Sequence, residues 1–261
     1  MRPSGIGLAL VALTGAAGIA QADTTGTVTV NAADSIYGAG QTGTPGTTAA
    51  GYSYTPSCAS ATTAGIPCGG YIPPSVAVTG HETVTFSSVT GTIVLNDDSG
   101  DNSNDANGKG AAVLSSSNSG ANNISGITAP DAGYLVGVFL KGPLTSAPTA
   151  FNFISGTPGT INFPSLSPAL GQVFFIGEGN NGGMHNAIQD FIAPAGSAYL
   201  YLGISDACGY NGSPSCYNDN LGNFSATYNI APATSVPEPA TLSLLSLGLA
   251  GIGFMRRRRH N

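Results

Sequence analysis

The chain has 261 residues and a formal net charge of −6 at pH 7, and only 8% of its residues are charged. Residues 23–235 contain twelve acidic and two basic side chains, so this part has a net charge of −10. A nucleic-acid-binding protein needs a basic surface, and this composition excludes that class. Because 41% of the chain is hydrophobic, a domain of this length can still bury a core.

The N-terminus has the three parts of a secretory signal peptide. Arg2 supplies a positive start, the apolar stretch "GIGLALVALTGAAGIA" follows, and "AQA" at Ala20–Ala22 places small residues at a cleavage position. We therefore expect residues 1–22 to be a signal peptide and the mature protein to be exported.

Residues 23–79 are predicted to form the N-terminal part of a β-sandwich. Within them, residues 31–75 are rich in Gly, Thr, Ala and Pro, and we interpret this stretch as a long surface excursion. The chain has four cysteines, which allow three pairings, and export permits their oxidation. The short spacings favour two local bridges, Cys58–Cys68 and Cys208–Cys216.

Residues 80–235 are predicted to form the core of the sandwich. Short segments rich in β-branched and aromatic residues alternate with Gly, Pro, Asn and Ser, which is typical of strands and turns. Helical periodicity is nearly absent, and Met184–Ile192 is the one helix candidate. The expected strands are Thr83–Phe86, Gly91–Leu95, Tyr134–Leu140, Phe151–Ile154, Gln172–Ile176, Ala198–Ile204 and Phe224–Ile230. This pattern predicts an all-β sandwich or closed β architecture.

An acidic stretch, Asn96–Gly110, follows the second expected strand. It holds four aspartates within nine residues, and hard cations prefer such oxygen ligands. The order of residues does not match an EF-hand loop. Two interpretations stay open, a solvated acidic turn and a secondary calcium site.

The stretch Gly203–Ala226 combines two cysteines with carboxylates and carboxamides. Asp206 ends one expected strand, and Asp219 and Asn220 precede the next. If these strands are neighbours, the three side chains meet at one end of a sheet, where they can bind a calcium ion. The alternative is an Asx-rich hairpin turn without an ion.

The segments "FIAPAGSAYLYLGISD" and "CYNDNLGNFSATY" resemble the C-terminal half of the galactophilic calcium-dependent bacterial lectins of the PA-I type. The likeness extends from about Gly80 to Ile230. It implies a jelly-roll-like, galactose-binding-like β-sandwich in which a calcium ion ligates two sugar hydroxyls.

The resemblance also implies a set of site residues. The calcium ligands would be the side chains of Asp206, Asp219 and Asn220 and the backbone carbonyls of Cys216 and Leu95. The sugar would contact Asp206, Asp219 and Asn220. The chain has no Trp that could stack on a sugar, and Tyr217 or Tyr210 is the candidate for that contact. Asp219 stands where these lectins have Asn, and the added charge favours cation binding.

The C-terminal residues 236–261 combine Pro237-Glu238-Pro239, the uncharged segment Ala240–Met255 and the basic run Arg256–Arg259. This order resembles the PEP-CTERM sorting signal, which is recognised by exosortase in bacteria that make extracellular polysaccharide. It implies that residues 240–255 occupy the inner membrane transiently. After processing, the protein would lie in the cell envelope or the extracellular matrix.

Together these patterns predict an exported, calcium-dependent, carbohydrate-binding protein associated with the cell surface or exopolysaccharide. The alternative is a structural surface or matrix protein that is sorted by exosortase and binds no sugar. We do not expect an enzyme, because candidate catalytic groups are few. The sequence has only three histidines, one of them in the tail, and it has no G-x-S-x-G motif.

Overall fold

The computed structural model describes residues 22–43, 46–47, 66–95, 103–108, 115–181 and 187–233. Within these ranges no helix is long and apolar enough to cross a membrane. Residues 1–21 of the predicted signal peptide, the Pro237–Pro239 motif and the Ala240–Met255 segment lie outside the described residues.

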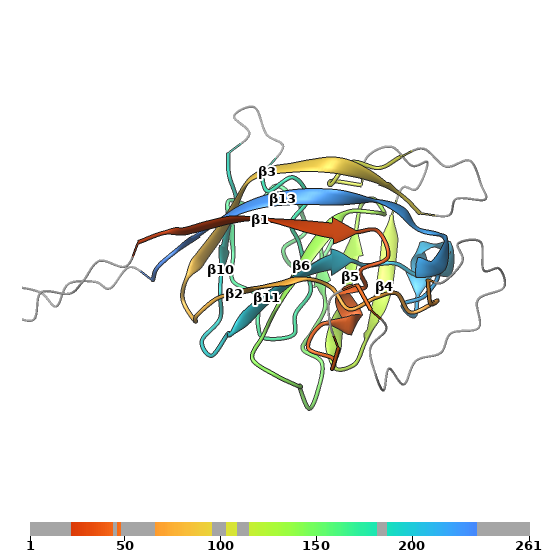
Figure 1. Cartoon of the computed structure of the whole chain (residues 1–261), viewed down its shortest axis with the longest axis horizontal. Helices are drawn as coiled ribbons and strands as arrows, with labels where there is room; N and C mark the ends of the chain where they lie inside the picture. The colour runs from red at the N-terminus through yellow and green to blue at the C-terminus, as the bar shows by residue number, and fades with distance from the viewer. Residues whose placement is uncertain are drawn as a thin grey trace, which may run out of the picture.

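The first sheet has the strand order β1-β13-β3-β10-β8. Its strands are β1 (Thr24–Asn31), β3 (Thr83–Val94), β8 (Ser165–Leu166), β10 (Asp190–Ile192) and β13 (Leu221–Ala231). Strand β13 lies between β1 and β3 and is antiparallel to both (Figure 1). At one end of the sheet Asn31 lies opposite Asn223, and Val94 lies opposite Leu221. The ends of β1 and β3 are therefore held beside the start of β13.

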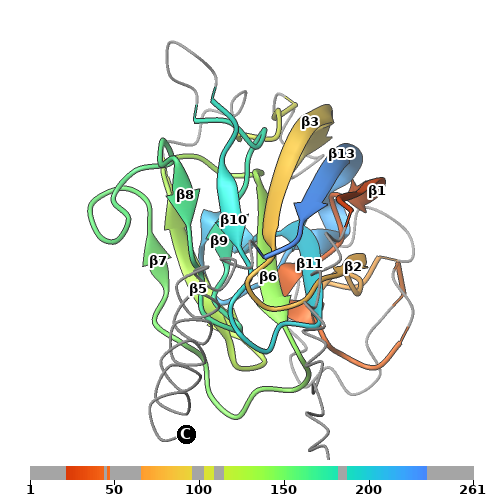
Figure 2. The same ribbon diagram turned by 90° about the vertical axis from the view of Figure 1, so that its left-hand side faces the viewer.

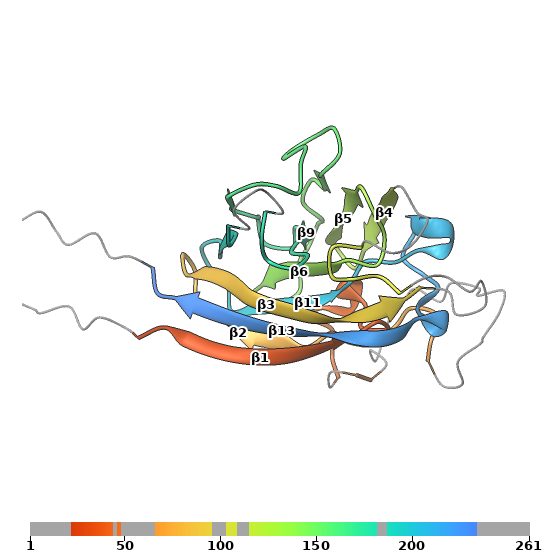
Figure 3. The same ribbon diagram turned by 90° about the horizontal axis from the view of Figure 1, so that it is seen from above.

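Two smaller sheets complete the fold. The second has the order β2-β11-β6-β9 and contains β2 (Ser75–Ala77), β6 (Leu135–Leu140), β9 (Phe174–Phe175) and β11 (Tyr199–Ile204). The third has the order β12-β4-β5-β7 and contains β4 (Ser116–Ala121), β5 (Ile124–Ala129), β7 (Phe151–Asn152) and β12 (Asn211–Gly212). Seen from above, β4 and β5 lie on the side away from β1 and β13 (Figure 3). Short 3-10 helices connect the strands: η1 (Ile36–Gly38), η2 (Cys208–Tyr210) and η3 (Tyr217–Asp219).

An aromatic cluster fills the space between the first and second sheets. The ring of Phe174 on β9 stacks on Phe139 of β6 and on Phe191 of β10, with centroid distances of 5.2 Å in both pairs. Figure 2 shows β9, β10 and β6 side by side at this end of the molecule. Burying one such side chain contributes about 1.5–3 kcal/mol. Gly137 on β6 leaves room for the Phe174 ring, because an added Cβ would lie 2.7 Å from its Cζ atom.

The predicted all-β class is confirmed, and the fold is a jelly-roll-like β-sandwich. Strand β11 has the expected alternation, with Leu200, Leu202 and Ile204 fully buried. Two of the expected strands are joined: Thr83–Phe86 and Gly91–Leu95 belong to the single strand β3, which ends at Val94. A strand of this length can pair with β13 from end to end.

The predicted helix at Met184–Ile192 is wrong in its described part. Residues 190–192 form β10, which pairs with β3 through Phe191 opposite Val84. The Phe191 side chain is fully buried in the aromatic cluster. Tertiary packing therefore overrides the weak helical pattern of this short segment.

The hairpin of β4 and β5 was missed by the sequence analysis. Its first strand, β4, consists almost entirely of Ser, Asn and Gly, which have low β-propensity, and β5 is a short segment interrupted by Ser125 and Gly126. The turn residues Asn122 and Asn123 have φ angles of 54° and 62°. Two consecutive left-handed residues match the right-handed twist of the paired strands, and Asn tolerates that conformation.

The predicted surface excursion at residues 31–75 is wrong for its first part. Residues 32–39 are all buried, and the side chains of Ile36 and Tyr37 are fully enclosed. The chain turns after β1, where the Asp34 backbone N–H donates to the carbonyl of Asn31. The small residues of this segment therefore allow close packing against the second sheet.

The side chain of Asp34 holds this turn from inside the protein. Its Oδ2 accepts hydrogen bonds from the backbone and side-chain nitrogens of Asn31, at 2.7 and 3.2 Å. Burial raises the pKa of Asp34 from 3.8 to about 6, although the Asn31 hydrogen bonds lower it. The folded state therefore binds the Asp34 proton more tightly than the unfolded state.

We expect Asp34 to make stability fall as pH rises from about 4 to about 6. Its stabilising effect is complete below the unfolded pKa of 3.8 and is lost as pH passes the folded pKa of about 6. Asp34→Asn should thus match the wild type near pH 4 and exceed it by about 3 kcal/mol at pH 7. Urea unfolding of both proteins across this range measures the difference, and a difference that does not change with pH contradicts the prediction.

Candidate functional site

The connection between β11 and β13 carries the predicted calcium ligands. The sequence analysis made the meeting of these ligands conditional on the two strands being neighbours in one sheet. They are not, because β11 belongs to the second sheet and β13 to the first. The hairpin-turn alternative is wrong for the same reason. The connection contains η2, β12 and η3, and β12 pairs with β4 of the third sheet. It lies at the end of the molecule where β1, β3 and β13 converge (Figure 1).

A disulfide closes this connection, as predicted. Cys208 and Cys216 are bonded, with Cα atoms 5.2 Å apart. Gly209 and Cys216 have φ angles of 68° and 65°, so the chain turns sharply at both ends of the loop. Cys68 is also disulfide-bonded. Its predicted partner, Cys58, lies outside the described residues, so the Cys58–Cys68 bridge stays a prediction.

Asp206 is the centre of the site, and its side chain is only 3% exposed. Its Oδ1 accepts a hydrogen bond from the Ala207 backbone nitrogen at 2.8 Å. Its Oδ2 accepts one from the Asn220 Nδ2 at 3.0 Å. The carboxylate is therefore oriented by donors from both ends of the disulfide-closed connection.

Asn220 joins this carboxylate to the first sheet. Its Nδ2 also donates to the carbonyl of Ala32, which follows β1, at 3.1 Å. Its Oδ1 is buried and accepts no hydrogen bond from the described part of the chain. A buried acceptor without a donor is costly, so this oxygen is suited to a cation or a bound water.

A cavity of about 130 Å³ brings most of the predicted residues together. Asp206, Asp219, Cys216 and Leu95 all line it. The other described lining residues are Ala207, Cys208, Gly209 and Tyr210. Leu95 reaches the cavity because β3 ends opposite the start of β13. Asn220, the remaining predicted side-chain ligand, is not one of the lining residues, but it is hydrogen-bonded to Asp206, which is.

The carboxyl of Asp206 is in an unfavourable electrostatic environment. Burial raises its pKa from 3.8 to about 8, and the negative charge of Asp219 also raises it. The hydrogen bonds from Asn220 and Ala207 lower the pKa but do not compensate for the burial. Two carboxyls that share a small cavity favour either a proton or a bound cation.

Tyr217 does not contribute a sugar-binding surface, which corrects the prediction. Its side chain is fully buried. Its hydroxyl donates to the Ile204 carbonyl at 2.9 Å and accepts from the Asp206 backbone nitrogen at 3.0 Å. Tyr217 therefore fixes the backbone at the end of β11. Tyr210, the other aromatic candidate, lines the cavity and is partly exposed.

Buried hydroxyl groups of serine and tyrosine side chains surround the backbone next to Asp206. Ser205, which precedes Asp206, shares a hydrogen bond of 2.8 Å with the Tyr37 hydroxyl. Tyr134 lies close enough to Asp206 for the Asp206 charge to raise its pKa, although burial has the larger effect. The Tyr134 hydroxyl is 3.0 Å from the Ser116 Oγ. The backbone around Asp206 is thus supported from the second and third sheets.

The described part of Asn96–Gly110, residues 103–108, uses its polar groups internally. Asp105 Oδ1 accepts from the Asn107 backbone nitrogen at 2.9 Å. Asn107 Oδ1 accepts from the Glu178 backbone nitrogen at 3.0 Å. The remaining three aspartates of the stretch lie outside the described residues. No group of three His, Cys, Asp or Glu side chains that could hold a metal ion occurs in the described ranges.

Removing the Tyr217 hydroxyl should destabilise the protein and leave the cavity lining chemically unchanged. In Tyr217→Phe, the buried Ile204 carbonyl and Asp206 nitrogen both lose a partner, which should cost about 2–4 kcal/mol. Urea unfolding of the two proteins gives this difference. A loss below about 0.5 kcal/mol, as is usual for surface changes, contradicts the role assigned to Tyr217.

Comparison with known proteins assigns the C-terminus. Residues 235–259 match the PEP-CTERM protein-sorting motif. No curated protein and no solved structure matches the chain, so the resemblance to the PA-I type lectins has no support from a homologue. The matched motif marks the chain as an exported protein that exosortase sorts to the cell surface or extracellular matrix.

Proposed function

We propose that this surface protein binds carbohydrate through a calcium ion held in the Asp206 cavity. The observation that carries the proposal is the cavity itself. Leu95, which follows β3, meets Asp206 and Asp219 of the β11–β13 connection there, and all three are among the residues that the sequence singled out. The sorting motif indicates a location at the cell surface, and carbohydrate binding would be the activity of the protein at that location.

The donor set suits a hard cation. Calcium takes six to eight oxygen ligands from carboxylates, carboxamides, carbonyls and water. Asp206 and Asp219 supply two carboxylates, Asn220 supplies a buried carboxamide oxygen, and Cys216 and Leu95 would supply backbone carbonyls. The remaining ligands would be water or sugar hydroxyls.

Charge also supports a cation at this position. Burial raises the pKa of Asp206 to about 8, and the negative charge of Asp219 adds to this rise. A divalent cation reverses this effect, because it stabilises the ionised form of both groups. The mature part of the chain has only two basic side chains against twelve acidic ones, so its overall field attracts cations.

The cavity has features that suit a sugar beside the ion. It is open to solvent on one side, and Tyr210 lines it. When bound, calcium would offer open coordination positions to vicinal hydroxyls. The Asp219 carboxylate, which is only partly buried, could accept a hydrogen bond from the same hydroxyls.

One observation favours the alternative of a structural surface protein without sugar binding. Both oxygens of Asp206 already accept hydrogen bonds from within the chain. A protonated or structurally paired Asp206 would hold the connection between the two sheets without any ligand. Measurements with calcium separate these two functions.

We expect calcium to stabilise the wild-type protein. Variants that lack the carboxylate of Asp206 or of Asp219 should not be stabilised by calcium. A bound ion adds about 2.7 kcal/mol at a hundredfold excess over Kd. The melting temperature should therefore rise with calcium and fall with a chelator. Asp206→Asn and Asp219→Asn keep the side-chain size and should abolish the response, whereas Asp190→Asn, at an exposed position on β10, should retain it. If calorimetry detects no calcium binding to the wild type at millimolar ion, the metal site is wrong.

We expect glycan binding to require the same ion. On a glycan array, the protein without its C-terminal sorting segment should bind certain saccharides in the presence of calcium. Binding to these saccharides should disappear when a chelator removes the calcium. Asp219→Asn should lose binding to the same saccharides in calcium, and Asp190→Asn should retain it. Calcium binding without any calcium-dependent glycan signal would support the structural alternative.

A further inference from the structure

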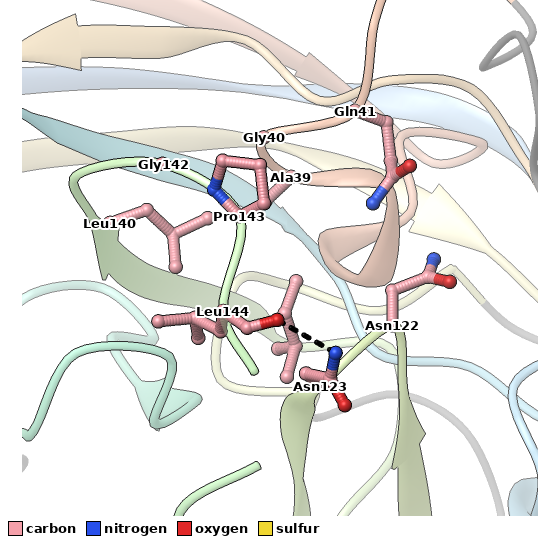
Figure 4. Close-up of a pocket in the computed structure, with 10 residues that line it drawn as sticks. Ala39, Gly40, Gln41, Asn122, Asn123, Leu140, Gly142, Pro143 and Leu144 are labelled. Atoms are coloured by element: carbon pink, nitrogen blue, oxygen red, sulfur yellow. Dashed lines mark hydrogen bonds between the residues drawn. The ribbon is translucent and has the colours of Figure 1, made fainter. Parts of the chain in front are cut away.

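A second cavity, of about 150 Å³, lies beside the turn between β4 and β5 and shares no lining residue with the Asp206 cavity. Carboxamides stand on one side of it and apolar side chains on the other (Figure 4). The carboxamides belong to Gln41, Asn122 and Asn123, and the apolar side chains to Leu140, Pro143 and Leu144. None of the described residues that line this cavity is charged.

The two asparagines are held in place by hydrogen bonds. Asn122 Nδ2 donates to the Tyr37 carbonyl, and Asn123 Nδ2 donates to the Leu144 carbonyl, both at 2.8 Å. Within the described part of the chain, the Asn122 Oδ1 accepts no hydrogen bond, and the Gln41 side chain makes none. The carboxamide of Asn122, which is held in one orientation, and that of Gln41 therefore meet at the cavity, and each can both donate and accept hydrogen bonds.

A pair of tyrosines extends this surface along β11. Tyr199 is 44% exposed, and its ring centroid lies 6.1 Å from that of Tyr201. Tyr199 is paired with Leu140 of the cavity wall, so the two side chains point to the same face of the sheet. Burial raises the pKa of Tyr201, and the nearby backbone of Gly40, which also lines the cavity, lowers it.

These features fit one class of ligand. Uncharged carboxamides match the hydroxyls of a neutral saccharide, which both donate and accept hydrogen bonds. Apolar and tyrosine surfaces match its C–H faces, and Tyr combines an apolar ring with a polar tip. The cavity is small and takes about one monosaccharide unit. A polyanionic glycan would be repelled, because residues 23–235 have a net charge of −10.

We propose that the cavity formed by Gln41, Asn122 and Leu140, together with the Tyr199–Tyr201 pair, binds a neutral oligosaccharide without a metal ion. One monosaccharide unit occupies the cavity, and the next units lie along the tyrosines. No carboxylate takes part, so this site does not depend on the calcium proposal. A chain with both sites would bind glycan at two places on its surface.

The test uses the released protein in chelator, with neutral hexo-oligosaccharides of glucose, galactose and mannose and an oligogalacturonate as probes. We expect at least one neutral oligosaccharide to bind and the oligogalacturonate not to bind. In ¹⁵N-labelled protein, the neutral probe should shift the side-chain amide signals of Gln41, Asn122 and Asn123. These shifts test the site in the wild type, whatever the folding of the variants.

Variants then assign the contacts. Gln41→Leu and Tyr199→Ala should each weaken binding by about tenfold. Ile154→Ala removes an apolar side chain of matched exposure, 45% against 44%, and should bind as the wild type does. Carrying out the measurement in chelator separates this site from the proposed calcium site, which is empty under these conditions. Absence of binding by every neutral probe at millimolar concentration, or wild-type affinity in both Gln41→Leu and Tyr199→Ala, overturns the proposal.

Discussion

The pairing of β13 with both β1 and β3 is the constraint on which the site depends. Strand β13 is hydrogen-bonded along its length on both sides, so its first residue has a fixed position relative to the ends of its neighbours. Asn220, directly before it, can then reach the carbonyl of Ala32 at the end of β1. Leu95, directly after β3, is held at the same end. Asp206 arrives from the other sheet and meets this frame through its hydrogen bond with Asn220. The site is thus a junction between two sheets.

The two cavities differ in the charge of the residues that line them. At the Asp206 cavity, two carboxyls lie in a partly dry environment, and burial opposes ionisation of one of them. In the function proposed for this cavity, a cation would relieve that cost, and charge would select the ligand. At the Gln41 cavity there is no charge to relieve among the described lining residues. In the oligosaccharide site proposed there, hydrogen-bonding capacity and apolar surface would select the ligand. A protein sorted to the cell surface or extracellular matrix by its PEP-CTERM motif would meet glycans there.

Several parts of the fold could be predicted because they depend on local pattern. Alternation in Tyr199–Ile204 follows from one face of β11 being buried, and the spacing of Cys208 and Cys216 matches a bridge between close residues. The hairpin of β4 and β5 could not be predicted from composition, because its Ser, Asn and Gly residues favour turns. Its strands form because β4 is paired on both sides, by β5 and by β12, which lies far along the chain.

The sequence by itself determined the β class, the acidic charge, the sorting motif and the residue types of the proposed calcium site, because each follows from composition or short spacing. The tertiary structure alone decided which of those residues share a surface. It placed Tyr217 inside the protein, since its hydroxyl is needed by two backbone groups at the end of β11. It assigned β11 and β13 to different sheets, although they are consecutive long strands. It brought Gln41 to Asn122, about eighty residues away, through the packing of the segment after β1 against the β4–β5 turn. No local pattern encodes these contacts, because they arise from the pairing and packing of segments distant in the chain.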